Sequence, residues 1–223
     1  MPNAAPIGIF GGSFDPLHNA HLRLAFSALD HLGLQSVRWL PNSVPGHREG
    51  PRASASHRLA MLHLALDAEA RFVIDEAELW QTEATYSINT LLRLRGELGT
   101  SVPLVFIIGA DHLLGLHRWR EWQRLFDFTH FAVAARPGFE IGDTSLTPEV
   151  AMEYTRRSKP IASLASSPAG CMVNFPFEPM DIASRSIRSA LASGSDSTQA
   201  LTPLLPAPVL QYIQDKHLYR PTL

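Results

Sequence analysis

The segment that most constrains the fold joins a short apolar run, a glycine turn and a long amphipathic stretch. Ile7–Phe10 is typical of a buried strand, and glycine, serine and proline residues then turn the chain. The next stretch places apolar side chains on one face of a helix, at Leu22, Ala25, Phe26 and Leu29. Strand, turn and helix in this order predict the first repeat of a layered α/β fold.

Apolar runs and amphipathic stretches alternate along the rest of the chain. Strands are expected at Ile7–Phe10, Ser36–Leu40, Phe72–Ile74, Leu104–Ile108, His130–Ala134 and Met172–Phe175. Helices are expected at His18–Leu32, Ser56–Asp67, Ile88–Leu98, Arg120–Phe126, Ser186–Ala192 and Pro208–Lys216. This alternation predicts crossover connections, and therefore a doubly wound parallel sheet with helices on both faces. Ligands of such sheets bind beyond the carboxyl ends of the strands.

The length of 223 residues predicts a single domain over residues 1–223, and 45% hydrophobic residues suffice for a sizeable core. Residues 139–170 are weakly patterned and are expected to form a surface insertion, with a helix near Pro148–Arg157. Residues 204–220 are expected to form a C-terminal helical segment. Helix ends are predicted at the N-caps Ser54 and Ser87 and at the stop residues Gly33 and Gly99.

Composition narrows the class of protein. The formal net charge of −2 argues against a general binder of nucleic acid or of membrane surfaces. The single cysteine, Cys171, excludes a disulfide framework. Met1–Pro6 lacks the features of a signal peptide, and no apolar run is long enough to span a membrane. We therefore expect a cytoplasmic protein that binds neither nucleic acid nor membranes.

The start of the first helix has the features of an anion site. His18 and His21 lie three residues apart and point the same way, and unpaired N–H groups and the positive end of the helix dipole collect there. This arrangement favours a phosphate chain, although a plain turn with two solvated histidines is the alternative. The glycine spacing does not match a dinucleotide fingerprint, and no Gly-Lys-Ser/Thr follows. A zinc site would lack a nearby third ligand.

Two further polar segments allow two interpretations each. The Pro41–Arg48 loop carries His47 and Arg48 at the end of a strand, which suits an anionic ligand or an ordinary exposed loop. Tyr86 and Ser87 precede a helix, where they would hold a ring and a phosphate, or where Ser87 simply caps the helix.

The segment after Ile108 also has two interpretations. Gly109 would let a ligand approach the backbone, and Asp111 would accept hydrogen bonds from a ribose or would cap a helix. Trp119 and Trp122 follow, as core residues or with one of them as a stacking platform.

A second helix start resembles the first in its chemistry. Asp181–Arg188 places hydroxyl groups and two arginines at a helix N-terminus, which suits phosphate, although a capped surface helix is the alternative. Two such sites in one α/β chain suit a ligand with several phosphates, such as a nucleoside triphosphate.

The stretch Gly12-Ser13-Phe14-Asp15-Pro16-Leu17-His18-Asn19-Ala20-His21 closely resembles the Gly-x-Phe-x-Pro-x-His-x-x-His motif of the nucleotidyltransferase superfamily. Within it, the chain is similar to the bacterial nicotinate-nucleotide adenylyltransferases from Ile9 to Arg220. The branch is indicated by Thr85-Tyr86-Ser87, Trp119 and Arg136-Pro137-Gly138. The resemblance implies a Rossmann-like fold.

The resemblance also implies a reaction, in which ATP and nicotinate mononucleotide give deamido-NAD and pyrophosphate in NAD biosynthesis. Mg²⁺ would be carried by ATP, with no metal held by the protein and no covalent enzyme intermediate. Preference for nicotinamide mononucleotide, or dual specificity, is the alternative within the class. The first motif is also compatible with a phosphopantetheine adenylyltransferase, and the nucleotide site with a regulator that has no chemistry. The protein would be a monomer or a homo-oligomer.

The resemblance assigns roles by position. The catalytic residues would be His18, His21 and Arg188. A phosphate beside the two imidazoles would favour their protonated form. ATP would contact Gly11, Gly12, Ser13, Phe14, His18, His21, Gly109, Asp111, Ser184 and Arg188. The pyridine nucleotide would contact His47, Arg48, Tyr86, Ser87, Trp119 and Arg136, with Trp119 stacked on the ring.

Two departures from the family pattern stand in the motifs. Ala20 replaces the glycine common before the second histidine. In the late motif, Ala183 replaces a serine and Arg185 a threonine, so that one hydroxyl contact is lost and one cation gained. The assignment of Arg188 is therefore firmer than that of Ser184. Arg185 has no assigned role.

Overall fold

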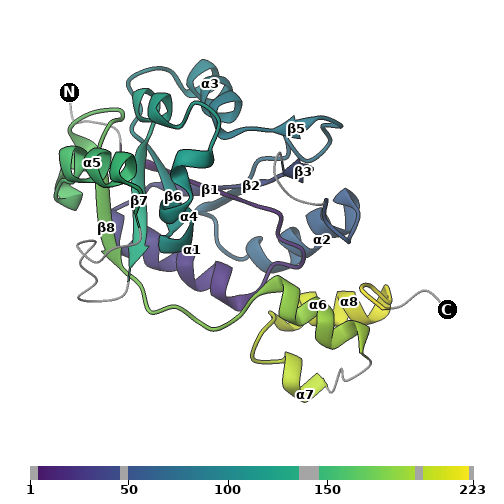
Figure 1. The fold of residues 1–223 in the computed structure, drawn as a ribbon. Helices are drawn as coiled ribbons and strands as arrows, with labels where there is room; N and C mark the ends of the chain where they lie inside the picture. The colour runs from purple at the N-terminus through teal and green to yellow at the C-terminus, as the bar shows by residue number, and fades with distance from the viewer. Residues whose placement is uncertain (1–4, 46–49, 136–145, 194–197, 221–223) are drawn as a thin grey trace. The chain divides into compact units, whose positions relative to one another are not determined.

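A computed structural model describes residues 5–45, 50–135, 146–193 and 198–220. Its strands and helices alternate along the chain, as the sequence predicts (Figure 1). The six-stranded sheet has the order β4-β2-β1-β6-β7-β8, and the short strands β3 (Val44–Pro45) and β5 (Ala84–Thr85) form a second, two-stranded sheet. The six strands are β1 (Ile7–Gly12), β2 (Ser36–Pro41), β4 (Phe72–Ile74), β6 (Leu104–Gly109), β7 (His130–Ala135) and β8 (Met172–Pro176).

The pairing of the central strands is parallel. Ile7 of β1 lies opposite Leu104 of β6, Val105 of β6 opposite His130 of β7, and Phe131 of β7 opposite Met172 of β8. The predicted α/β class is therefore confirmed, and all six predicted strands are present. Strand β4 has the predicted bounds, and the other five extend one or two residues further.

The chain divides into two compact units. The first comprises Met1–Phe10, Leu24–Arg38 and Thr85–Glu178, and the second comprises Gly11–Arg23, Trp39–Ala84 and Pro179–Leu223. Strands β1 and β2 and helix α1 (Asn19–Leu32) each contribute residues to both units.

The first unit is built on β6, β7 and β8. The residues of β6 and β7 are almost all buried because these two strands lie inside the sheet, whereas β8 is an edge strand and is buried in part. Its helices are α3 (Ser87–Leu98), α4 (Ala110–Leu114) and α5 (Pro148–Arg157), with 3₁₀ turns at Leu116–Arg118, Trp122–Asp127 and Ile161–Ala165. Helix α5 has the bounds expected from the sequence. Helix α4 and the turn at Ile161–Ala165 had no predicted counterpart, because each is shorter than two helical turns.

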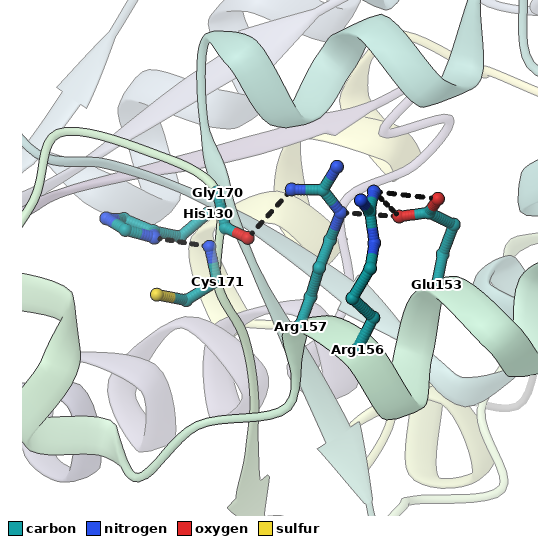
Figure 2. A network of polar contacts seen from close by, with 6 residues as sticks. All are labelled: His130, Glu153, Arg156, Arg157, Gly170 and Cys171. Atoms are coloured by element: carbon teal, nitrogen blue, oxygen red, sulfur yellow. Dashed lines mark hydrogen bonds and ion pairs between the residues drawn. The ribbon is translucent and has the colours of Figure 1, made fainter.

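A polar network holds the segment between α5 and β8 (Figure 2). Glu153 is buried and accepts hydrogen bonds from Arg156 and Arg157, while Nη1 of Arg157 donates to the carbonyl of Gly170 at 3.2 Å. The fully buried His130 accepts from the N–H of Cys171 at 3.0 Å. His130 and Cys171 lie at the amino ends of β7 and β8. Ligands of such sheets bind at the carboxyl ends of the strands, so this network lies at the opposite end of these two strands.

The second unit has its own apolar cluster. Helices α2 (Ala55–Leu66), α6 (Ser184–Ala192), α7 (Thr198–Leu201) and α8 (Ala207–Asp215) supply it. Its buried members are Ala53, Met61, Ile187, Leu191, Leu201, Leu205, Val209, Leu210 and Ile213. The C-terminal helical segment therefore packs within this unit, where it helps to build the surroundings of the phosphate-site candidates.

Most predicted helix ends agree with the structure. Ser54 caps α2 by accepting from the N–H of His57, and Gly33 and Gly99 follow helices with φ of 63° and 86°. Ser87 is not a cap, since Tyr86 takes the N-cap position without a side-chain hydrogen bond.

The helix expected at Arg120–Phe126 is instead the 3₁₀ turn at Trp122–Asp127, because Glu121 has a left-handed backbone with φ of 52°. No helix among the described residues is long and apolar enough to cross a membrane.

Candidate functional site

Three carbonyl oxygens of the loop between β1 and α1 accept hydrogen bonds from side chains of the same unit. Nη1 of Arg58 donates to the carbonyl of Ser13 at 2.7 Å, Nη1 of Arg188 to that of Asp15 at 2.6 Å, and the Ser184 hydroxyl to that of Pro16 at 3.1 Å. A carbonyl dipole repels phosphate, whereas an N–H attracts it. Engaging these three carbonyls therefore favours anion binding by the loop.

Phe14 fixes the path of this loop. It has a left-handed backbone with φ of 46°, and its side chain is 2% exposed. The ring packs against Trp39 at 5.2 Å between centroids and meets the His21 ring edge-on at 5.2 Å. Gly12 lies beneath it, and a Cβ at that position would come within 3.0 Å of the Phe14 ring. Phe14 is thus a packing residue that supports His21 from inside.

The two motif histidines form a stacked pair at the start of α1. Their ring centroids are 3.7 Å apart with an interplanar angle of 22°. Helix α1 begins at Asn19, one residue later than predicted, because the carbonyl of His18 accepts from the N–H groups of His21 and Leu22 as a capping residue does. The N–H of His18 in turn donates to Nδ1 of His21 at 3.2 Å. This exchange is that of a capping box with histidine as the acceptor, and it leaves Nε2 as the protonated nitrogen of a neutral His21.

Burial keeps both imidazoles neutral at pH 7. It lowers the pKa of His18 from 6.5 to about 4, although the interaction of the ring with its own backbone acts in the opposite direction. It also lowers the pKa of His21 well below 6.5, and the charge of a protonated His18 would lower it further. Nδ1 of His18 is buried and has no hydrogen-bond partner within the described part of the chain. Both side chains would therefore contact a phosphate first as uncharged N–H donors. A ring would gain a proton only through the negative charge of the bound phosphate, which raises its pKa.

Helix α6 contributes the late motif to the same unit. It begins at Ser184, two residues before the predicted start, and Ala183 at its N-cap makes no side-chain hydrogen bond. The Arg188 side chain is 27% exposed, and its Nη1 lies 3.7 Å from Oδ2 of Asp15. Arg185 is exposed. Ser184 and Arg188 thus contact the loop that carries the histidines, as expected if both motifs hold one ligand.

Asp15, Arg58 and Tyr219 are three further polar residues around this loop that had no predicted role. Asp15 is 3% exposed and accepts from the N–H groups of Arg52 and Ala53 at 2.7 and 3.1 Å, and from the Tyr219 hydroxyl at 2.7 Å. Arg58 is 2% exposed on the inner face of α2. Asp15 lies inside the nucleotidyltransferase motif, so that its position was a signal, whereas nothing in the local pattern singles out Arg58 or Tyr219.

In the first unit, Gly109 and Asp111 lie together at the end of β6. A Cβ at Gly109 would come within 2.6 Å of Oδ1 of Asp111, so a larger residue there would displace the carboxylate. Oδ1 of Asp111 is also 3.3 Å from Nδ1 of His112, and the hydrogen bond from His112 lowers the pKa of Asp111. The Asp111 side chain is largely exposed, as a residue that binds a ribose needs to be.

The aromatic residues of the first unit are accessible in part. Trp119 is half-buried, and its ring meets Phe106, His112 and Phe131 edge-on at 5.6, 6.3 and 6.5 Å between centroids. Trp122 is also half-buried, so neither tryptophan is a fully buried core residue. The guanidinium of Arg120 lies 4.9 Å from the centre of the Tyr86 ring.

The predicted site residues thus fall into two groups and a remainder. The second unit holds Gly11, Gly12, Ser13, Phe14, His18, His21, Ser184 and Arg188, and the first holds Tyr86, Ser87, Gly109, Asp111 and Trp119. The predicted residues His47, Arg48 and Arg136 lie outside the described residues. Among the residues that the structure describes, no three histidine, cysteine or acidic side chains are grouped so as to hold a metal ion.

Comparison with known proteins identifies the family. Residues 9–186 match the family model described as cytidylyltransferase-like. A curated relative from Dechloromonas aromatica, named a probable nicotinate-nucleotide adenylyltransferase, is 44% identical over 216 residues, with 96% of this chain and 98% of the relative covered. A relative of the same name from Laribacter hongkongensis is 43% identical over 221 residues, with 99% and 96% covered.

Solved structures agree at the level of the fold. A Plasmodium falciparum nicotinic acid mononucleotide adenylyltransferase complexed with NaAD has a TM-score of 0.70 and 19% identity, with 97% of this chain and 98% of that chain covered. The class is therefore that of the cytidylyltransferase-like proteins. Within this class, the chain belongs to the nicotinate-nucleotide adenylyltransferases.

Proposed function

We propose that the protein transfers the adenylyl group of ATP to nicotinate mononucleotide, which yields deamido-NAD and pyrophosphate and serves NAD biosynthesis. The names of full-length relatives at 38–44% identity support this reaction. The observation that carries it in this chain is the convergence of two phosphate motifs on one loop. The motif histidines begin α1, and Ser184 and Arg188 of α6 donate to carbonyls only two or three residues before them.

For this reaction the protein needs mainly to orient the two substrates and to stabilise the charge that develops on the phosphates. The phosphate of the mononucleotide attacks the α-phosphorus of ATP, the bond to the bridging oxygen breaks, and pyrophosphate leaves with the electron pair. The nucleophile is already ionised, so no general base is needed. Charge moves toward the leaving pyrophosphate, and catalysis consists of donors that stabilise it there.

We assign these donors to the second unit. Nε2 of His21 donates to the triphosphate, because its Nδ1 is engaged by the N–H of His18. His18 lies beside it and gains a proton as the phosphate charge offsets the effect of burial on its pKa. Arg188 binds the β- and γ-phosphates with the guanidinium nitrogens that do not contact Asp15. Mg²⁺ enters as part of the substrate, bound to ATP.

The first unit would bind the remaining parts of the substrates. Asp111 accepts from ribose hydroxyls of the adenosine, beside the closely packed Gly109. Trp119 stacks on the pyridine ring, which its partly exposed indole allows. Tyr86 and Ser87 lie at the start of α3, where N–H groups and the helix dipole favour a carboxylate over an amide. This feature supports the acid as substrate, with dual use of acid and amide as the alternative.

A His18→Ala variant tests the assigned chemistry. We expect turnover to fall on the order of 100-fold or more while the fold is kept, because the imidazole stabilises charge and its removal opens only a small space. His31→Ala is the matched control, since His31 is an exposed imidazole of the same helix whose Nδ1 contacts the carbonyl of Ser27. Unchanged turnover in His18→Ala would overturn the role of the histidine pair.

A further inference from the structure

We propose that Tyr219 is a positioning residue for ATP: its hydroxyl holds the Asp15 carboxylate so that Arg188 stays available to the triphosphate. This inference rests on the proposed function, because it concerns the residue that would bind the β- and γ-phosphates. It adds a role for the C-terminal segment of the chain, which carries none of the motif residues.

The carboxylate of Asp15 is almost saturated by neutral donors. Oδ1 accepts from the Tyr219 hydroxyl at 2.7 Å and from the N–H of Ala53 at 3.1 Å, and Oδ2 accepts from the N–H of Arg52 at 2.7 Å. Two cations lie near it, Arg58 and Arg188. Arg58 donates to the Ser13 carbonyl, and Nη1 of Arg188 stays 3.7 Å from Oδ2 while donating to the Asp15 carbonyl at 2.6 Å. The guanidinium is therefore anchored through one nitrogen and does not form the two-pronged pair that arginine and carboxylate prefer.

Removal of the Tyr219 hydroxyl would change this balance. A buried carboxylate that loses a donor seeks another, because an unsatisfied buried charge is costly. Arg188 is a charged donor within reach, since its Nη1 needs to move only from 3.7 Å to hydrogen-bond distance of Oδ2. Closing a two-pronged pair with Asp15 would draw its guanidinium away from the phosphates. Tyr219 thus competes with Arg188 for the same carboxylate, and this competition favours ATP binding.

The backbone delivers Tyr219 to this position. After α8, the N–H of His217 donates to Gln214 and that of Leu218 to Ile213, and His217 is left-handed with φ of 51°. These are the two bonds of a Schellman motif, which reverses the chain after the helix. Tyr219 is left-handed as well, with φ of 66°, and packs with Leu218 against the apolar cluster of the unit. The hydroxyl is thus placed by packing and by turn geometry together.

Tyr219 is suited to remain a donor at every working pH. Burial raises the pKa of its hydroxyl, and the negative charge of Asp15 together with the hydrogen bond raises it further. The nearby charges of Arg188 and Arg58 oppose this shift without cancelling it. The hydroxyl therefore keeps its proton, and Asp15 receives a neutral hydrogen bond from it and not a second negative charge.

The test is the affinity for MgATP, measured by calorimetry without acceptor, in wild type and in Tyr219→Phe. We expect the dissociation constant to rise about tenfold, the size of one hydrogen bond to a charged group. The KM for nicotinate mononucleotide should change little. Tyr212→Phe is the matched control, because its hydroxyl lies in α8 and contacts His57 at 2.9 Å, away from the loop.

A double-mutant cycle separates positioning from mere stabilisation. If Tyr219 acts through Arg188, then Tyr219→Phe should have no further effect on MgATP affinity in an Arg188→Lys background, where the two-pronged pair cannot form. An equal loss in both backgrounds, or MgATP affinity in Tyr219→Phe within about twofold of wild type, would overturn the proposal.

A second background tests the route through Asp15 itself. Asp15→Asn removes the charge for which Tyr219 and Arg188 compete, and Tyr219→Phe should then leave MgATP affinity as it is in Asp15→Asn alone. A further loss of affinity in that background would contradict the route through Asp15. Failure of the proposed function would appear differently, as a wild-type protein that binds MgATP and releases no pyrophosphate with the mononucleotide.

Discussion

Two buried carboxylates, Asp15 and Glu153, are satisfied in opposite ways. The donors to Asp15 come from distant parts of the chain and are mainly neutral, namely two backbone N–H groups and a tyrosine hydroxyl. The donors to Glu153 are Arg156 and Arg157, which lie three and four residues further along the same helix. Burial alone would raise the pKa of Glu153, but the hydrogen bonds from the two arginines outweigh it and lower the pKa.

This difference separates a structural network from a candidate binding site. Around Glu153 the cations are used within the protein, since Arg157 also donates to the Gly170 carbonyl and lies 4.2 Å from the centre of the Phe126 ring. Around Asp15 the neutral donors satisfy the charge, and Arg188 keeps binding capacity for a ligand. A buried carboxylate that leaves the nearby arginine without a close ion pair is therefore more informative about function than one that is fully paired with arginines.

The largest predicted effect comes from neutralising each acid in turn. Asp15→Asn should lower kcat/KM for ATP on the order of 100-fold, because the loop, Arg188 and Tyr219 all lose the charge that organises them. Glu153→Gln should leave kcat/KM at the wild-type level and lower the free energy of unfolding by about 1–3 kcal/mol. Steady-state kinetics and urea unfolding of the two variants measure both quantities. A comparable loss of kcat/KM in Glu153→Gln would contradict the distinction between a structural network around Glu153 and a binding site around Asp15.

Acid should destabilise both regions through their buried histidines. Burial lowers the pKa of His18 to about 4 and lowers that of His130, so below pH 6.5 the unfolded chain binds protons that the folded chain does not. Stability is therefore fully present above pH 6.5 and falls as the pH drops toward 4, by up to about 1.4 kcal/mol per pH unit for each ring. Thermal unfolding between pH 7.5 and 4.5 checks this, and a melting temperature independent of pH would contradict it.

MgATP should distinguish these two histidines. A phosphate beside His18 favours the charged ring, whereas both nitrogens of His130 are engaged, by the Ser167 carbonyl and the Cys171 N–H. Calorimetry at pH 6 in two buffers of different ionisation enthalpy should reveal proton uptake on MgATP binding. We expect the uptake to be lost in His18→Gln and kept in His130→Gln. Binding without proton uptake in the wild type would mean that His18 stays neutral beside the phosphate.

The smallest effect concerns two left-handed residues. Phe14 is buried and supports His21, so replacing it by glycine would lose packing as well as relieve the backbone. His217 is exposed at the end of α8, and His217→Gly should raise the free energy of unfolding by about 0.5–1 kcal/mol without changing activity. Urea unfolding of the single variant is sufficient, and a destabilised His217→Gly protein would show that its side chain contributes contacts.

Local patterns were sufficient to predict the framework. Runs such as Leu104–Ile108 are apolar because they are buried on both faces, and the chain shows this directly. The histidine pair and the late motif were also visible, since each lies within one short segment. Ser87 failed as a predicted cap because a capping residue type does not reveal whether the preceding residue takes the position.

Contacts between distant residues were not visible in the sequence. The Tyr219 hydroxyl and Asp15 are 204 residues apart, and neither local spacing nor composition connects them. The same holds for Arg58, whose charge is buried in a helix that otherwise contributes apolar residues to the core. Such partners are set by tertiary packing, which brings α2, α6 and the C-terminal turn to one loop.

The most direct test of the account is pyrophosphate release by the purified protein with MgATP, comparing nicotinate mononucleotide with nicotinamide mononucleotide. We predict rapid release with the acid, formation of deamido-NAD, and a much lower kcat/KM with the amide. Equal use of both would keep the reaction and replace the assigned specificity by dual use. No release with either substrate would contradict the proposed function.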